Sequence, residues 1–393
     1  MRGSLQGGLT DAMRRICKKL AVLFAGSCLI LMWAGRAWGA ESRDIPKIPG
    51  LTYESSMELV YAQGFDVHRY QGGYSLVDIH DSGRFLVIPQ GKEAPEGLSE
   101  EVVPLKQPLS NVYLAATAVM SLFDALDALD HIRFSGAQAD HWYIQGARER
   151  MEAGEILFAG KYNEPDYELL IGEDCSLAIE STMILHAPKV QEMLEDLGIP
   201  VLVDHSSYES HPLGRTEWIR LYGVLTGKEE AAETFFAQQS KIMEELEGFP
   251  NTEKRVAYFY ISTEGTAVVR SETDYIPKMI EIAGGRYAFE GVRSKVGESA
   301  SVSMTMEDFY EQAVDADYLI YNASIDAPIT TVEELLAKSQ LFSDFKAVQE
   351  GNVWCTGKYL YQATDIVGEL IRDIHGMLTG EAGQEMTFLS RCQ

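Results

Sequence analysis

Cysteine is scarce in this chain, and its scarcity excludes two kinds of protein. Five cysteines occur in 393 residues, and the three beyond residue 40, Cys175, Cys355 and Cys392, have no regular spacing. Small secreted domains held by disulfides need dense, paired cysteines, and structural zinc sites need them at short fixed intervals. The sequence therefore contains neither a disulfide framework nor a cysteine-based zinc motif.

Basic side chains are also few. The chain has 33 Lys and Arg against 59 Asp and Glu, a formal net charge of −26. Because residues 1–40 hold six of the basic residues and one acidic residue, a chain without this segment is more acidic still. Such a surface repels nucleic acid and anionic lipid, so we expect no nucleic-acid partner.

Long apolar runs are missing beyond residue 40. A helix needs about 20 apolar residues to cross a bilayer, and no such run follows the first 40 residues. We therefore do not expect the chain to be a channel or permease itself. Its length and its 46% apolar content allow a large core and favour two domains.

Residues 1–40 have the layout of a secretory signal peptide. Basic residues within 14–19 precede an apolar run at 20–33, and small residues follow before residue 41, which is the typical order in such signals. A second interpretation is a lipoprotein cut before Cys28, although Ala25 stands where a larger aliphatic residue is usual. We expect the protein to be exported, as a periplasmic protein or, if Cys28 is acylated, as a cell-surface lipoprotein.

Residues 41–104 are expected to form an N-terminal extension that contains a β-hairpin. The stretch YSLVDIHDSGRFLVIPQG, residues 74–91, alternates apolar and polar residues on both sides of Asp81, Ser82 and Gly83. Alternation interrupted by such turn residues is typical of a hairpin.

After residue 104 short apolar runs alternate with helical patterns, in two series. The runs of the first series lie at 131–137, 155–160, 175–181 and 199–204, and those of the second at 255–262, 266–271, 316–323 and 352–357. Strands that alternate with helices predict parallel βαβ units. We therefore expect an α/β fold with two lobes, at residues 105–227 and 250–393, the second ending in a helix near 366–378.

The segment between the two lobes, residues 228–249, is predicted to be a single long helix. It is rich in strong helix formers and contains no Gly or Pro before Gly248. A helix over 229–247 would be about 28 Å long. Two lobes joined by one stiff helix would leave a cleft between them, with strand-end loops of both lobes facing it.

Ligands of open α/β sheets bind beyond the carboxyl ends of the strands, so the strand-end loops supply the candidate ligand-binding residues. The loop after the run IPVLVD is unusually crowded with polar and aromatic groups. The first-lobe candidates are Ser110, Asn111, Tyr113, Trp142, Tyr143, Lys161, Tyr162, Ser181, Thr182, Met183, Tyr208, Glu209, His211 and Arg215. The second-lobe candidates are Arg270, Tyr275, Arg286, Trp354 and Tyr359. Aromatic rings offer area to a large planar or chelated ligand, and the cations offer partners to its anionic groups.

Arg215 has two interpretations. It stands just after Gly214, where a helix is predicted to begin, so its guanidinium could contact an anionic ligand. The alternative is an ordinary ion pair with Glu209 or Glu217.

The candidate ligands of a bare metal ion are His186, His205, His211 and Glu209, which fall on or near strand-end loops. Imidazole and carboxylate groups at such positions could hold Zn²⁺ or Mn²⁺. Their spacing does not complete a ligand set, so no metal site is predicted, and a Zn/Mn receptor stays as an alternative. Haem would need only one axial His or Tyr.

Four segments resemble the helical-backbone substrate-binding proteins of ABC importers. These segments are 165–204, 219–236, 274–292 and 302–322, and they include the phrases PDYELLIG, LGIPVLVD, EIAGGRYAFEGV and DADYLIYN. The resemblance covers about residues 105–378 in the order of that family. The region before residue 100 lies outside it.

The resemblance implies a class III, cluster A receptor, like those for ferric siderophores, haem and cobalamin. Such a receptor binds its ligand between the lobes and delivers it to a membrane permease driven by an ATPase. In that family one acidic residue on each lobe docks on the permease, and the matching positions here are Glu168 and Glu307, with Glu164 as a near alternative. We expect a monomer without a cofactor of its own.

Enzyme motifs are absent from the sequence. GVLTGKEE, residues 223–230, lacks the hydroxyl residue that a phosphate-binding loop requires after its lysine, and no Gly-x-Ser-x-Gly elbow occurs. No catalytic residue is therefore predicted. The remaining hypothesis from another class is an exported hydrolase or chelatase-like enzyme on a two-lobed scaffold, which would consume its substrate instead of binding it at one equivalent.

Overall fold

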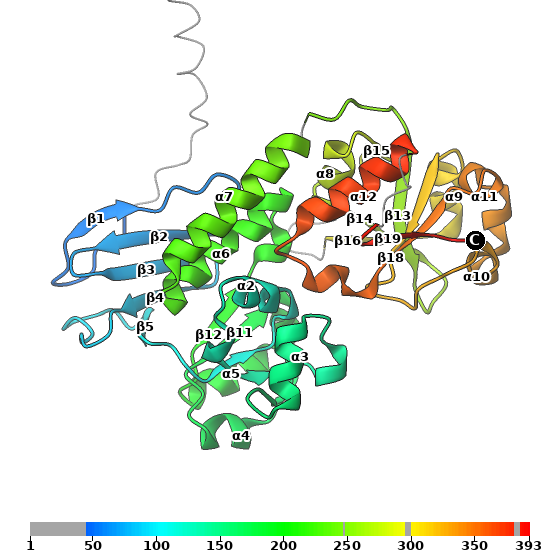
Figure 1. The fold of residues 1–393 in the computed structure, drawn as a ribbon. Coiled ribbons are helices and arrows are strands. Elements are labelled where there is room, and N and C mark those ends of the chain that lie inside the picture. Colours follow the sequence, from blue (N-terminus) through cyan, green and yellow to red (C-terminus); the bar gives the residue numbers. More distant parts are fainter. Residues whose placement is uncertain (1–44, 247, 295–299, 381–385) are drawn as a thin grey trace, which may run out of the picture. The chain divides into compact units, whose positions relative to one another are not determined.

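The computed structural model of the chain describes residues 45–246, 248–294, 300–380 and 386–393 (Figure 1). The predictions about the signal peptide and Cys28 lie outside these residues. The chain divides into two compact units, Met1–Lys47 and Ile48–Gln393. Within the described ranges, no helix is both long and apolar enough to span a bilayer.

The larger unit begins with a five-stranded sheet. Its strands, in sheet order, are β1 (Tyr53–Ser56), β2 (Phe65–Tyr70), β3 (Tyr74–Ile79), β4 (Gly83–Ile88) and β5 (Val102–Lys106). Neighbours are antiparallel except β4 and β5, which run parallel. The predicted hairpin is present as β3 and β4, with Asp81 at a left-handed φ of 58° in the turn, but it is part of a larger sheet than the sequence indicated.

Both faces of this sheet are covered. Val67, Val77 and Phe85 on one face join the main hydrophobic core, while Leu76 and Leu86 on the other pack in a small separate cluster. β1 is exposed along its length and β5 contains Pro104, so neither shows the apolar alternation of a half-buried strand. The sequence therefore indicated only the central hairpin.

The first lobe is a parallel sheet flanked by helices. Its strands, in sheet order, are β12 (Val201–Asp204), β11 (Leu177–Ser181), β6 (Val112–Leu114), β7 (Ile132–Ser135) and β8 (Leu157–Phe158). Its helices are α2 (Met120–Ala125), α3 (Gln145–Glu152), α4 (Tyr167–Gly172) and α5 (Pro188–Asp196), and a small ribbon is formed by β9 (Gly160–Lys161) and β10 (Glu164–Pro165). All four predicted runs of the first series are strands here.

The second lobe is a mixed sheet. Its strands run in the order β16 (Ser301–Met304), β14 (Ala267–Arg270), β13 (Arg255–Ile261), β17 (Tyr318–Tyr321), β18 (Val353–Thr356) and β19 (Leu389–Arg391), with β15 (Arg286–Tyr287) beside β13. Its helices are α8 (Tyr275–Ile282), α9 (Met306–Ala313), α10 (Val332–Lys338), α11 (Lys346–Gln349) and α12 (Val367–Thr379).

Only part of the second sheet follows the parallel pattern that the sequence predicted. β13, β17 and β18 are parallel, whereas β14, β16 and β19 are antiparallel to their neighbours. The run 266–271 follows β13 after a tight turn in which Gly265 has φ 78°. A connection this short can only return the chain antiparallel, because a parallel partner needs a crossover of a dozen residues or more.

Two antiparallel helices connect the lobes. α6 (Pro212–Thr226) is almost wholly buried, and Gly227, at φ 72°, ends it before α7 (Glu229–Leu246) begins. α7 lies beside both α6 and α12 (Figure 1). The fold class, two α/β lobes joined by a long helix, is confirmed, and the helix is braced along its length by its neighbours.

Candidate ligand-binding site

The strand-end loops of the two lobes meet, and we call this region the lobe boundary. It consists of residues 136–144 and 205–216 of the first lobe and residues 271–275 and 357–364 of the second. Segment 271–275 follows β14, which is antiparallel to β13 and so ends toward the other edge of its sheet. The other three segments follow the parallel strands β7, β12 and β18, so each continues from the carboxyl end of a parallel strand. Ligands of open α/β sheets bind at such ends.

Gln362 joins the lobes through its side-chain amide. Its Oε1 accepts the backbone N–H of Tyr143 at 2.9 Å, and its Nε2 donates to the carbonyl of His141 at 2.8 Å. The rings of Tyr143 and Tyr359 lie alongside, with centroids 5.8 Å apart. Since Tyr143 is about half exposed, the pair presents aromatic surface at the lobe boundary.

A second contact forms at the start of α6. The Thr216 hydroxyl donates to the carbonyl of Thr364 at 2.8 Å. One residue earlier, the guanidinium of Arg215 lies 4.1 Å from the centre of the Tyr275 ring. Cation–π contact of this kind is favourable when the cation is shielded from water.

Arg215 is a buried cation with little compensation. It is 5% exposed, it lies in the first turn of α6, and its Nε has no hydrogen-bond partner among the described residues. The positive end of the helix dipole makes this place unfavourable for a cation. A buried charge without a counter-ion is costly, so the position favours an anion from outside the chain.

The nearby carboxylates already have other partners. Asp204 accepts hydrogen bonds from Ser206 and from the Tyr222 hydroxyl, and burial raises its pKa. Asp274 accepts the Ile276 N–H and lies 3.3 Å from Arg270 Nε, and burial raises its pKa too. Neither carboxylate is within ion-pair distance of Arg215, although both interact with it electrostatically.

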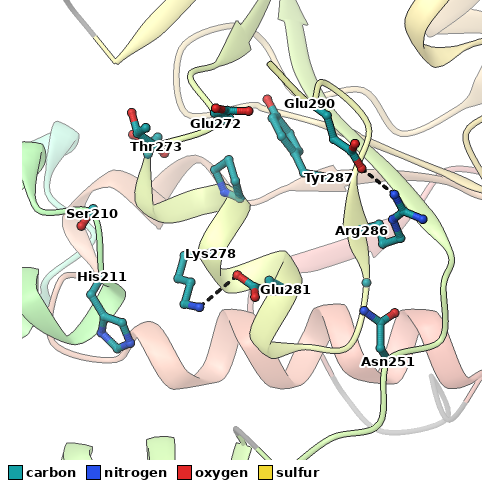
Figure 2. Close-up of a pocket in the computed structure, with 13 residues that line it drawn as sticks. Ser210, His211, Asn251, Glu272, Thr273, Lys278, Glu281, Arg286, Tyr287 and Glu290 are labelled. Atoms are coloured by element: carbon teal, nitrogen blue, oxygen red, sulfur yellow. Dashed lines mark hydrogen bonds and ion pairs between the residues drawn. The ribbon is translucent and has the colours of Figure 1, made fainter. Parts of the chain in front are cut away.

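A cavity of about 460 Å³ opens beside α8 and reaches the lobe boundary (Figure 2). The first lobe contributes Ser210 and His211, and the second contributes Asn251, Glu272, Thr273, Asp274, Pro277, Lys278, Glu281, Gly285, Arg286, Tyr287 and Glu290. Two ion pairs lie in its wall, Lys278–Glu281 at 2.9 Å and Arg286–Glu290 at 2.7 Å. The volume falls in the range of small-molecule sites.

His211 is a neutral imidazole in this wall. Its Nδ1 accepts the N–H of Leu213 at 3.2 Å, which caps α6, and its ring stacks on Tyr61 with centroids 4.3 Å apart. Burial, together with the charge of Lys278, lowers the pKa of His211 to about 4. The ring is therefore an acceptor at neutral pH.

Glu209 faces away from the predicted cleft. Its carboxylate accepts the N–H groups of Gln63 and Gly64 and the indole N–H of Trp218, all within 3.0 Å. Burial raises its pKa. A carboxylate whose oxygens are fully used in this way fixes the chain, and in this conformation it is closed to a ligand.

Several candidates lie in the core. Tyr113, Trp142 and Trp354 are at most 6% exposed. The Tyr113 hydroxyl donates to the carbonyl of Gly160, and the Trp142 indole donates to Ser135. Their size made them look like ligand contacts, but large aromatic side chains fill core space equally well.

Three candidates, at two places, stand at the wrong end of their strands. Ser110 and Asn111 precede β6 instead of following it, and the Asn111 amide donates to the carbonyl of Glu173. Arg286 pairs with Arg255 at the amino end of β13, where it forms ion pairs with Glu290 and Glu253. Of these three residues, only Arg286 lines the cavity.

The other first-lobe candidates are on strand-end loops or nearby, and among the described residues their side chains make no hydrogen bond or ring contact with the second lobe. Ser181 caps a short helical turn through Met183 N, and Thr182 and Tyr162 are half-buried. Lys161 is exposed on β9, Met183 is exposed, and Tyr208 lies edge-on to His205.

The expected docking residues have matching positions. Glu168 is the second residue of α4 and Glu307 is the second residue of α9, and both are exposed. Glu164, the alternative, is exposed on β10.

Metal ligands do not gather in the described part of the chain, where no group of three or more His, Cys, Asp and Glu side chains is arranged to hold an ion. The residues that the sequence did not single out are Gln362, Thr216 and Thr364. Only tertiary contacts mark them, because Gln and Thr are common on any surface.

A family model described as "Periplasmic binding protein" matches residues 117–360. Among curated proteins, an uncharacterized lipoprotein of Methanocaldococcus jannaschii is 24% identical over 364 residues, which cover 86% of this chain and 84% of the relative. The residues from β6 to the end of the chain, 112–393, make up less than 86% of it, so the similarity must extend into the segment before β6.

Solved structures with the same fold include two binding proteins. A periplasmic haem-binding protein from Pseudomonas aeruginosa has a TM-score of 0.57 at 12% identity, covering 72% of this chain and 98% of its own. An ABC-type Fe³⁺-hydroxamate transport protein from Saccharomonospora viridis has a TM-score of 0.53 at 19% identity, covering 69% and 93%. At these identities the likeness establishes the fold.

Proposed function

The chain belongs to the periplasmic binding protein family, and on that premise we propose that it is the extracytoplasmic substrate-binding protein of an ABC importer. Its ligand in this proposal is a ferric siderophore, haem or a corrinoid, bound at the lobe boundary and delivered to a permease. The haem-binding and Fe³⁺-hydroxamate proteins that share its fold support the first two ligand classes. The corrinoid class rests on the resemblance of the sequence segments alone.

The observation that carries the proposal is the meeting of strand-end loops from both lobes around an uncompensated cation. Arg215 of the first lobe lies against Tyr275 of the second, and the tyrosine pair 143 and 359 crosses the same boundary. A ligand with an aromatic or chelate surface and an anionic group would satisfy both features.

Titration of the purified protein tests this function. Haemin, ferrichrome and cyanocobalamin are added in turn while the intrinsic tryptophan fluorescence is followed. We expect one probe to saturate at one equivalent and to be recovered unchanged. Chemical conversion of a bound probe would favour the exported enzyme, and the absence of binding by all three would reject the proposed ligand classes.

The same proposal places the protein outside the cytoplasm. The names of the M. jannaschii relatives, both uncharacterized lipoproteins, favour acylation at Cys28 over release by signal peptidase. Intact-mass measurement of the membrane-extracted protein decides between them, because an acylated chain that begins at Cys28 is heavier than its sequence mass.

A further inference from the structure

The loop between β1 and β2, residues 57–64, is tied to the first lobe by two buried carboxylates. Glu217 accepts the backbone N–H groups of Val60, Tyr61 and Ala62 at 2.8–2.9 Å. Glu209 accepts those of the next two residues at 2.9 Å. Five consecutive backbone donors therefore bond to two side chains that lie about 150 residues further along the chain.

Both carboxylates are held rigidly on the first-lobe side. Trp218 Nε1 donates to Glu209 at 2.9 Å, and Arg220 Nη1 donates to Glu217 at 3.0 Å. Glu217 is fully buried and Glu209 is 5% exposed. Hydrogen bonds to ionised groups are roughly twice as strong as neutral ones, and a buried carboxylate without donors is costly, so loop 57–64 and the two glutamates depend on each other.

Two glycines allow this close approach. A Cβ on Gly64 would stand 2.8 Å from the Trp218 ring, and a Cβ on Gly214 would stand 3.2 Å from the carbonyl of Tyr61. Both distances are shorter than ordinary van der Waals contact. The sequence therefore keeps side chains out of the place where loop 57–64 packs on the start of α6.

Loop 57–64 reaches the cavity wall through Tyr61. The phenol ring of Tyr61 stacks on the imidazole of His211 at an interplanar angle of 20°, and His211 lines the cavity four residues before Arg215. At the β3–β4 turn, His80 and Asp81 lie near enough to His205 to influence it electrostatically. Loop 205–211 is thus supported from the side of the N-terminal sheet.

We infer that the N-terminal sheet, β1–β5, supports the ligand site through its β1–β2 loop. Tyr61 of this loop is a positioning residue that holds His211. The inference rests on the proposed function, because the site it serves is the lobe boundary. The sheet precedes residue 117, where the family match begins, so it lies outside the matched residues. Its presence explains why a loop beyond β12 carries so many polar and aromatic groups.

Replacement of the ring alone separates positioning from simple support of the fold. Loop 57–64 is held by its backbone N–H groups, which Tyr61→Leu leaves in place. The substitution removes the stack on His211 and the edge-on contact with Phe236, and it keeps an apolar side chain. Tyr53→Leu is the matched control, since Tyr53 lies on β1 of the same sheet and contacts Tyr70, Ser56 and His68 instead.

Two measurements are made on the full chain. The first is an NMR titration of the His211 imidazole, assigned with His211→Gln. In Tyr61→Leu we expect its signals to move and its pKa to rise from about 4 toward the ordinary value of 6.5, because the ring becomes more exposed. The second is the affinity for whichever of haemin, ferrichrome and cyanocobalamin binds, which we expect to fall by about two- to tenfold, the worth of one aromatic pair.

Tyr53→Leu should change neither quantity. His211 signals that stay unchanged in Tyr61→Leu would overturn the positioning role, and so would an unchanged affinity for a probe that binds the wild type. If no probe binds the wild type, the proposed ligand classes fail, and the His211 titration alone then decides whether the sheet positions loop 205–211.

Discussion

At the scale of single residues, the account depends most on Arg215. A cation that is almost fully buried at a helix N-terminus, with an unpartnered Nε in the described part of the chain, reduces stability unless an anion joins it. Asp204 and Asp274, which interact with it electrostatically, have other partners. Glu209 and Glu217, the partners that the sequence also allowed, accept the N–H groups of loop 57–64 instead, and contact with an anionic ligand is our proposal for Arg215.

Arg215→Ala should weaken binding of an anionic ligand by about 1.5–3 kcal/mol, the range for a hydrogen bond to a charged group. The unliganded protein should unfold at the same or a higher urea concentration, because the variant loses an uncompensated charge. Arg215→Lys keeps the charge without the planar guanidinium, so its ligand affinity should lie between those of the wild type and Arg215→Ala. Equal affinity in all three proteins, measured by fluorescence titration, would assign Arg215 to packing on Tyr275.

Glu180 makes stability depend on pH. This residue of β11 is fully buried, and its carboxylate oxygens have no hydrogen-bond partner among the described residues. Burial raises its pKa well above the ordinary value, so the folded chain keeps a proton that the unfolded chain releases. Stability is then greatest below the ordinary glutamate pKa and falls as pH rises toward the folded-state pKa.

Glu180→Gln removes this titration. We expect the variant to gain stability over the wild type as pH increases, with a larger gain at pH 8 than at pH 5 in urea denaturation. Glu195→Gln, on the exposed surface of α5, should follow the wild type at both values. A constant difference between wild type and Glu180→Gln would mean that Glu180 is protonated to the same extent in the folded and unfolded chains.

At the scale of elements, the α6–α7 pair sets the spacing of the lobes. A Cβ on Gly223 of α6 would lie 2.7 Å from Ala232 Cβ of α7 and 3.3 Å from backbone atoms of residues 228 and 229. The two helices therefore pack closer than any residue larger than glycine allows. Because α7 leads directly into the second lobe, this contact also fixes where that lobe begins.

Gly223→Ala should destabilise the protein by about 1–3 kcal/mol through overpacking, which exceeds the gain of up to about 1 kcal/mol in helix propensity. The double variant with Ala232→Gly should recover part of the loss. Gly172→Ala in α4, whose Cβ would meet nothing within 4 Å, is the control and should be neutral or stabilising. Urea midpoints measure all three, and an undisturbed Gly223→Ala would show that the helices can separate without cost.

The sequence predicted elements better than their contacts. Every strand of the two predicted series is present. These strands could be predicted because an apolar run between helical patterns is a local property of the sequence. β14 was assigned to a parallel unit because the run AVVR gives no sign of direction, and β5 was missed because Pro104 interrupts it. Strand direction is decided by connection length and partners, which are not properties of the run itself.

For the site residues too, the sequence predicted what depends on local pattern and not what depends on distant contacts. Tyr143, Arg215 and Tyr275 come together because they follow strand ends, which the sequence located well. Trp142 packs in the core, and the Glu209 carboxylate bonds to loop 57–64, because burial is decided by segments distant in the chain. Gln362 could not have been found, since its function consists of two hydrogen bonds to the other lobe.

At the scale of the whole molecule, the proposed delivery to a permease requires a partner that recognises both lobes. Glu168 and Glu307 occupy the same place at the start of one helix in each lobe. Opposed charges at a docking rim determine orientation and capture rate more than affinity. In this proposal both carboxylates contact the permease at the same time only when both lobes are correctly placed.

Changing Glu168 and Glu307 together to Lys should leave ligand affinity unchanged and slow uptake in a reconstituted importer by at least about tenfold, because a like charge replaces an attractive one on each lobe. The control changes Glu192 and Glu333 to Lys, which alters the net charge equally at two other exposed sites. Normal uptake by the first variant, or an equal loss in both, would exclude these two residues as the docking pair.

The most direct test of the central claim is hydrogen–deuterium exchange of the full chain with and without a saturating probe that binds it. Binding at the lobe boundary predicts slower exchange in segments of both lobes at once, 136–144 and 205–216 in the first and 271–275 and 357–364 in the second. Slower exchange confined to one lobe, or located only at strands remote from these loops, would contradict the account.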